Sequence, residues 1–241
     1  MNNKLIELAA IYGIEISEYE NVLLMRYMDL LLEYNKKFNL TAITEPDDVL
    51  EKHFLDSLLI FKNWKPASGI KLVDIGTGGG LPGIPIAILK PDIDVCLLDS
   101  VNKKVQFLEI VKEELDIKNI FPLWSRTEDL TKKARESFDV ITARAVAHLG
   151  VLIEYAFPLL KTGGILIALK GPNIDTEIQE SSPALKEFGA QIINIDKISL
   201  PTAGERNLVI IKKTKKTSSK YPRNAGLVKQ SPFYYKLLGK A

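Results

Sequence analysis

Apolar positions in residues 1–65 recur at the three- and four-residue spacing of a helix that buries one face. A long segment of this kind follows Ser17, whose separation from Glu20 is that of a capping box. A second helix is predicted to begin at Thr44, because Pro46 suits the first turn of a helix. The first 65 residues are therefore expected to form a helical extension packed on the rest of the chain.

After a linker at residues 65–69, short apolar runs alternate with helical segments. The predicted strands span residues 70–75, 94–98, 119–123, 138–143, 164–169, 189–198 and 206–212. The predicted helices span residues 82–89, 101–115, 128–136, 147–160 and 173–187. This alternation predicts an α/β fold, with a mainly parallel seven-stranded sheet, helices on both faces and a final antiparallel hairpin. The expected units are the extension (1–65), the α/β domain (66–213) and a tail (214–241).

The composition, with 46% hydrophobic and 26% charged residues, is that of a globular protein. No run approaches the roughly 18 apolar residues of a membrane span, and the N-terminus lacks the apolar core of a signal peptide. Cys96 is the only cysteine, so no internal disulfide is possible. These features predict a cytoplasmic protein with no membrane contact.

Charge is distributed unevenly, although the net charge is only +2. Residues 206–241 contain ten Lys and Arg and no Asp or Glu, which leaves 22 basic and 30 acidic residues elsewhere. A basic segment on an acidic body indicates contact with a polyanion, and a merely solubilising tail is the alternative. Residues 212–220 are low in complexity and are expected to be mobile, whereas Phe233, Tyr234 and Tyr235 are able to dock.

Five glycines within residues 76–83 follow the apolar run 70–75. Such a loop between a strand and a helix is a common cradle for nucleotide-like ligands, and a tight turn without a ligand is the alternative. Residues 78–83 match the dinucleotide pattern G-x-G-x-x-G, but the match begins three residues beyond the strand. Asp74 precedes it, and a carboxylate there would repel a pyrophosphate and attract a cation. The loop thus favours S-adenosylmethionine over NAD.

Two later segments support an adenosine ligand. Asp99 ends the next apolar run, where a carboxylate can accept both ribose hydroxyls in either class of enzyme. A helix N-cap is the alternative role for Asp99. Residues 125–129 follow the third strand and are placed to contact the adenine edge, although Thr127 and Glu128 also read as a helix cap.

The ordered motifs resemble one family, the bacterial 16S rRNA guanine-N7 methyltransferases, also called glucose-inhibited division protein B. The resemblance covers about residues 20–212. It is carried by Asn39–Ala42, His53–Ser57, Asp74–Pro85, Leu98–Ser100, Ser125–Glu128, Ala143–Ala145, Ala168–Gly171 and Gly204–Arg206. Gly79 and Thr142 depart from residues common in the family, and neither change removes a donor or acceptor.

The resemblance implies a class I methyltransferase, with a Rossmann-like sheet, and transfer of a methyl group from S-adenosylmethionine to N7 of a guanine in 16S rRNA. It places Arg144 between cofactor and substrate as the residue that orients both, with a salt bridge to an acid such as Glu128 as the alternative. The implied cofactor-binding residues are Asp74, Gly76, Gly78, Leu81, Asp99, Ser100, Thr127, Glu128 and Arg144.

The implied chemistry needs no general base, because N7 of guanine carries a lone pair and no proton. The chain has two histidines, His53 and His148, and no catalytic dyad is evident. His53 and Asp56, three residues apart, are expected to tie the extension to the domain, with an acid–base pair as the alternative. Two distant histidines and one cysteine predict no metal site.

RNA contacts are assigned to basic residues at the sheet rim and in the tail, and the alternative for the rim residues is a structural salt bridge. They are Lys170, Arg206, Lys212, Lys213, Lys215, Lys216, Lys220 and Arg223. The expected partner is 16S rRNA or the small ribosomal subunit, bound by a monomer. A small-molecule methyltransferase, an NAD oxidoreductase and a non-enzymatic rRNA-binding assembly factor are the competing functions.

Overall fold

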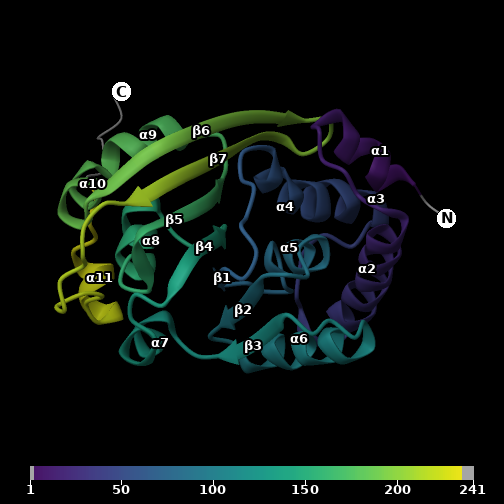
Figure 1. Ribbon diagram of the computed structural model, residues 1–241, viewed down its shortest axis with the longest axis horizontal. Coiled ribbons are helices and arrows are strands. Elements are labelled where there is room, and N and C mark those ends of the chain that lie inside the picture. The colour runs from purple at the N-terminus through teal and green to yellow at the C-terminus, as the bar shows by residue number, and fades with distance from the viewer. Residues whose placement is uncertain (1–2, 235–241) are drawn as a thin grey trace.

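The computed structural model describes residues 3–234, and helices cover both faces of a central sheet (Figure 1). The N-terminal part contains α1 (Lys4–Ile11), α2 (Glu18–Phe38), α3 (Pro46–Val49), the π-helical turn η1 (Leu50–Leu55), α4 (Asp56–Leu58) and the 3-10 turn η2 (Leu59–Lys62). The predicted capping box forms, since the Ser17 amide donates to Glu20 Oε2 at 2.7 Å and the Glu20 amide to Ser17 Oγ at 3.3 Å. The second predicted helix begins at Pro46 and continues through a π turn.

The seven strands confirm the predicted fold class. They are β1 (Lys71–Ile75), β2 (Asp94–Asp99), β3 (Ile120–Trp124), β4 (Phe138–Arg144), β5 (Leu160–Lys170), β6 (Ala190–Leu200) and β7 (Gly204–Lys213). Their order is β3-β2-β1-β4-β5-β7-β6, and only β7 is antiparallel to its neighbours. The chain leaves β1 toward β2 on one side and returns to β4 on the other. Ligands of such sheets bind at the carboxyl ends of the strands beside this reversal.

The later helices differ from prediction at two places. They are α5 (Gly83–Leu89), α6 (Asn102–Glu114), α7 (Thr127–Lys133), α8 (Leu149–Ala156), α9 (Ile174–Glu180), α10 (Ser182–Phe188) and α11 (Ala225–Gln230). The helix predicted over 147–160 ends at Ala156, because Leu160 already belongs to β5. The helix predicted over 173–187 is two helices, since Pro183 lacks the amide hydrogen that would continue the first.

Side chains on the two faces of the sheet enter different cores. In β1, Leu72 packs with the N-terminal helices, α5 and α6, whereas Val73 and Ile75 pack with α8 and α10. Tyr27 of α2 stacks on Phe54 at 5.2 Å and donates its hydroxyl hydrogen to the Gly79 carbonyl at 2.5 Å. The extension therefore shares a core with the sheet and supports the glycine loop. The predicted unit boundaries at residues 65 and 213 stay predictions.

The segment after β7 is tied to the body of the protein, although residues 212–220 were expected to be mobile. The Arg135 guanidinium donates to the carbonyls of Thr217, Ser218 and Tyr221 at 2.6–3.0 Å. Phe233 packs edge-on against Phe188 at 5.5 Å. Tyr234 stacks on the imidazole ring of His148 at 3.8 Å, and Tyr235 lies outside the described residues. No helix in the described part of the chain is long and apolar enough to cross a bilayer.

Candidate functional site

A hollow of about 380 Å³ opens beside the carboxyl ends of β1 and β2. This volume lies in the range of small-molecule sites, about 300–1,000 Å³. Five predicted cofactor residues line the hollow, namely Gly76, Asp99, Ser100, Thr127 and Glu128. The motifs separated along the chain thus meet in one place, which we call the adenosine pocket after the ligand that the sequence predicts for it.

Asp99 connects the glycine loop to the start of α6. The Gly78 amide donates to Asp99 Oδ2 at 2.9 Å, and the Val101 amide donates to Asp99 Oδ1 at 2.8 Å. Gly76 and Gly78 have φ angles of +67° and +62°, which an L side chain adopts only with strain. The loop conformation therefore depends on these glycines and on the carboxylate that also lines the pocket.

Asp74 lies beneath the loop and not in the adenosine pocket. Its carboxylate is fully buried and accepts hydrogen bonds from the Gly83 amide at 3.0 Å and the Thr142 hydroxyl at 2.9 Å. Burial raises its pKa to about 6 despite these donors. Strand alternation turns Asp74 to the same face as Leu72, toward α5. The expected direct contact between Asp74 and a cofactor does not fit this placement, and Leu81 is likewise buried.

A second hollow, of about 360 Å³, lies beside the first and is here called the basic hollow. Its lining residues are Lys52, His53, Asp56, Arg144, Ala145, Leu169, Lys170, Gly171 and Arg206. Ala145 lines both hollows, so the two cavities meet directly after β4. Four cationic side chains and one carboxylate give the second hollow the charge expected of an anion- or purine-binding site.

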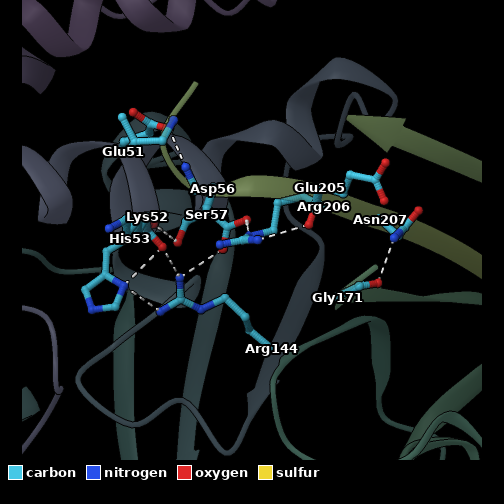
Figure 2. Close-up of polar contacts among 12 residues, drawn as sticks. Glu51, Lys52, His53, Asp56, Ser57, Arg144, Gly171, Glu205, Arg206 and Asn207 are labelled. Carbon is cyan, nitrogen blue, oxygen red and sulfur yellow. Dashed lines mark hydrogen bonds and ion pairs between the residues drawn. The ribbon is translucent and has the colours of Figure 1, made fainter. Parts of the chain in front are cut away.

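Arg144 is held by residues of the N-terminal extension (Figure 2). Its Nη1 donates to the Lys52 carbonyl and to Asp56 Oδ2, both at 3.1 Å, and its Nη2 lies 3.3 Å from His53 Nδ1. Asp56 Oδ1 lies 3.3 Å from Arg206 Nε, so one carboxylate joins two arginines. The acidic partner of Arg144 is thus Asp56 and not Glu128. His53 and Asp56 meet through Arg144, with no direct hydrogen bond between them.

The electrostatics of this cluster keep His53 neutral. Burial and the neighbouring positive charge of Arg144 lower the pKa of His53 to about 4. Burial raises the pKa of Asp56, while Arg144 and Arg206 oppose that rise. A histidine with so low a pKa is a weak base at neutral pH, so the cluster offers hydrogen-bond donors and charge but no strong proton acceptor.

Lys170 lines the basic hollow but is already paired within the protein. Its Nζ donates to the Ala147 carbonyl at 2.5 Å and to Glu177 Oε1 at 2.6 Å, and its side chain is 9% exposed. The structural salt bridges weighed as alternatives for Lys170 and Arg206 therefore exist. Both side chains nevertheless face the hollow, where either can add a hydrogen bond to a ligand.

The tail cations are divided between internal and surface positions. Lys213 is fully buried, and its Nζ donates to Glu136 and to two carbonyls at 2.6–2.8 Å. It therefore does not reach RNA in this arrangement, which corrects the prediction for this residue. Arg223 and Lys220 pair with Glu154 and Glu187. Among the exposed cations of this segment, Lys212, Lys215 and Lys216 lie at the end of β7 opposite Arg206.

Sequence reasoning missed several lining residues of the adenosine pocket. Lys104 lies 3.9 Å from Asp99, and its position in the first turn of α6 was a usable signal. Tyr155 comes from α8 and Ala225 from α11, and both line the pocket. Nothing local in the sequence indicates that the chain returns to the pocket at Ala225. The described residues hold no cluster of His, Cys, Asp and Glu suited to a metal ion.

Comparison with known proteins agrees with this geometry. The fold resembles that of a solved SAM-dependent methyltransferase from Aquifex aeolicus, with a TM-score of 0.53 and 17% identity over 72% of this chain and 96% of that one. A ribosomal protein L11 methylase from Lactobacillus delbrueckii subsp. bulgaricus is similar, with a TM-score of 0.53, 19% identity and coverage of 68% and 79%. The fold is that of a class I methyltransferase.

Residues 20–209 match the family GidB, rRNA small subunit methyltransferase G. A ribosomal RNA small subunit methyltransferase G of Clostridium botulinum (strain Alaska E43 / Type E3) is 45% identical over 91% of this chain and 93% of its own. The protein of that name from Desulforamulus reducens is 45% identical over 90% and 92%. The chain belongs to the GidB family of rRNA small subunit methyltransferases, which confirms the resemblance seen in the motifs.

Proposed function

We propose that this protein transfers a methyl group from S-adenosylmethionine to N7 of a guanine in 16S rRNA. The observation that carries the proposal is the meeting of the adenosine pocket and the basic hollow at Ala145, beside Arg144. A nucleoside cofactor in the first cavity and a purine in the second would bring a methyl donor and acceptor together. The expected substrate is the rRNA or the small subunit, met by a monomer in the cytoplasm.

The residues of the adenosine pocket fit S-adenosylmethionine. The Asp99 carboxylate would accept the ribose hydroxyls beside Ser100, and Thr127 and Glu128 lie where the adenine edge would be. Gly78 leaves room for the methionine portion to approach the backbone, whereas the Val146 side chain lies against Gly76. Bound here, this cofactor supplies an electrophilic methyl group on a sulfonium. Two carboxylates in the lining disfavour the pyrophosphate of NAD.

The basic hollow fits a base that needs positioning and not deprotonation. N7 of guanine already has an in-plane lone pair, and the low pKa of His53 leaves no strong base nearby. The Arg144 guanidinium is placed to donate to O6 of guanine or to a flanking phosphate and to close the cofactor side. Alignment of N7 with the methyl group and exclusion of water would then set the rate. The rate is therefore expected to be nearly constant between about pH 6 and 8.

The exposed tail cations are proposed to contact phosphates beyond the target guanine. Lys212 lies six positions after Arg206 in β7, a span of roughly 20 Å along a strand. RNA that contacts both ends of β7 must therefore extend well past the nucleotide in the basic hollow. This arrangement favours a folded rRNA region or an assembled subunit over a short fragment.

Two assays test the proposal. In calorimetry, S-adenosylmethionine is expected to bind with micromolar affinity and NAD not at all. With methyl-labelled cofactor, label is expected in small-subunit rRNA, and the Arg144→Ala protein is expected to bind cofactor yet transfer little. Label in a small molecule only would indicate a small-molecule methyltransferase. RNA binding without cofactor binding or transfer would indicate an assembly factor.

A further inference from the structure

We propose that His53 and Asp56, both in the N-terminal extension, are positioning residues that orient Arg144 for catalysis, with the proton of His53 on Nε2. The proposal rests on the proposed function, in which Arg144 orients the guanine. It makes the extension part of the active site, so the α/β domain alone would lack an oriented arginine.

Within the described residues, Arg144 makes all its polar contacts with one short stretch of chain. The Lys52 carbonyl, the His53 ring and the Asp56 carboxylate lie within η1 and the first residue of α4. They engage three of the five N–H hydrogens of the guanidinium. π-Helical turns are rare overall but occur often at functional sites. This turn carries two of the three acceptors of Arg144, and the third, Asp56, follows it directly. Two donors of Arg144 stay available to a ligand.

Two contacts compete at Nδ1 of His53. It lies 3.3 Å from Arg144 Nη2, which has hydrogens and no lone pair, and 3.1 Å from the Lys52 carbonyl oxygen, which already accepts a hydrogen bond from Arg144 Nη1. A proton on Nδ1 would reach that carbonyl but would also face the positive guanidinium, so we assign to Nδ1 the lone pair that accepts from Arg144. Nε2 then carries the hydrogen and donates to Thr41 Oγ1 at 2.7 Å. Besides Arg144, the charged groups that line the same hollow are Lys52, Asp56, Lys170 and Arg206.

The partner of His53 is itself fixed by a local loop. Asn35 Oδ1 accepts hydrogen bonds from the amides of Leu40 and Thr41 at 2.7 and 2.9 Å. Thr41 Oγ1 also accepts from the Ile43 amide at 3.0 Å. A continuous set of hydrogen bonds therefore runs from α2 through Thr41 and His53 to Arg144.

Asp56 fixes the spacing of two cations. Its two oxygens lie 3.1 Å from Arg144 Nη1 and 3.3 Å from Arg206 Nε, and the carboxylate is buried. Both arginines line the basic hollow. The carboxylate therefore holds the two guanidinium groups side by side, and each keeps N–H donors that do not contact Asp56. An asparagine amide in place of Asp56 would present its N–H hydrogens to one of the guanidinium groups. The two positive charges, of Arg144 and Arg206, would then tend to separate.

Nitrogen NMR tests the proton position without any catalytic readout. The chain has only two histidines, so ¹⁵N-histidine labelling gives two rings, and a His148→Gln variant identifies the signals of His53. We expect an unprotonated Nδ1, a protonated Nε2 and no titration between about pH 5.5 and 8. A protonated Nδ1, or titration near the ordinary histidine pKa, would overturn the proposal even if the enzyme is active.

Two substitutions at His53 test the effect on Arg144. The amide of His53→Asn reaches the position of Nδ1, whereas that of His53→Gln reaches the position of Nε2. We expect His53→Asn to keep kcat within about tenfold and His53→Gln to lose about 100-fold, the scale of misplaced catalytic groups. KM for the cofactor should not change in either.

Asp56→Asn should lose kcat to a similar extent as His53→Gln and keep cofactor binding. Equal losses in both His53 variants, in step with their loss of thermal stability, would show a merely structural role and contradict the proposal. A wild-type protein that methylates no RNA would refute the proposed function instead, and the NMR result would still decide the proton position.

Discussion

Asp74 and His53 are two buried titratable residues whose pKa values move in opposite directions. Burial raises that of Asp74 from 3.8 to about 6 and lowers that of His53 from 6.5 to about 4. The folded protein therefore binds an extra proton at Asp74 and lacks one at His53 over nearly the same pH range. Their contributions to the pH dependence of stability oppose each other.

Comparison of wild type with His53→Asn isolates one of these contributions. The pKa of His53 is lower in the folded protein than in the unfolded protein. The contribution of neutral His53 to stability is therefore largest above pH 6.5 and is lost as the pH falls toward 4. The difference in unfolding free energy between the two proteins should therefore grow by about 3 kcal/mol as pH rises from 4 to 6.5. Urea denaturation at several pH values measures it. For Asp74→Asn the difference should fall with rising pH, and a constant difference in both would contradict these assignments.

Gly78 lies in the glycine loop and Gly69 lies outside it, so the two form a matched pair for substitution. Both have positive φ, +62° and +74°, and a Cβ at either would meet nothing closer than 4.0 Å. Alanine should therefore cost each about 1 kcal/mol of stability through backbone strain. Only Gly78→Ala should weaken cofactor binding, by about tenfold or more, which calorimetry measures. Equal affinities for the two variants would show that the cofactor does not approach the loop backbone.

The sequence predicts the location of residues that stand at the end of a strand. It does not predict the location of residues that depend on burial or on a partner far away in the chain. Gly76 directly follows β1 and Asp99 ends β2, so the carboxyl edge of the sheet brings both to the pocket. Asp74 lies two positions before Gly76, inside β1, where its side chain is fully buried beneath the loop, and its place in the sequence does not reveal that burial. The Asp56–Arg144 pair joins residues 88 positions apart, a distance that no local pattern resolves.

At the scale of elements, strand positions followed from apolar runs, whereas helix ends required specific breaks. Pro183 divides α9 from α10. After α8, the chain has already entered β5 at Leu160. The π turn η1 had no signal beyond a continuous helical pattern, yet it directs the contacts to Arg144. Hydrophobic spacing specifies which face is buried but not a small change in helical pitch.

The C-terminal segment should contribute to stability through Arg223. Its guanidinium pairs with Glu154 at 2.6 Å, and Glu154 is fully buried. Arg223→Ala would leave a buried carboxylate without its partner and should cost about 3 kcal/mol. Lys216→Ala, at an exposed position of the same segment, should change stability by less than about 0.5 kcal/mol. Urea denaturation compares them, and equal small effects would mean that the segment contributes little to folding.

For the whole molecule, the N-terminal extension and the C-terminal segment each contribute to one of the two hollows. The extension supplies Lys52, His53 and Asp56 to the basic hollow, and the C-terminal segment supplies Ala225 to the adenosine pocket. The sequence predicts both segments and the packing of the extension on the domain, but not which residues they bring to the two hollows, because tertiary contacts between distant segments leave no periodic trace. The predicted basic tail likewise gave no sign that Lys213 is buried.

The salt dependence of RNA binding should reveal the role of the exposed tail cations. Changing Lys212, Lys215 and Lys216 to Gln should reduce the slope of log affinity against log salt by about 2 units for the small subunit. A short fragment around the target guanine should show no change, since these residues lie roughly 20 Å from Arg206. Replacing Lys65, Lys71 and Lys118, also exposed, provides the control. An unchanged slope with the subunit would make the tail a solubilising segment.

Mapping N7-methylguanosine in 16S rRNA tests the central claim most directly. The rRNA would come from cells that lack this protein and are supplied with the wild type, with Arg144→Ala or with nothing. We predict one N7-methylated guanine that depends on the wild-type protein and is strongly reduced with Arg144→Ala. An identical methylation pattern in all three, or a dependent methyl group on another atom or another RNA, would contradict the account.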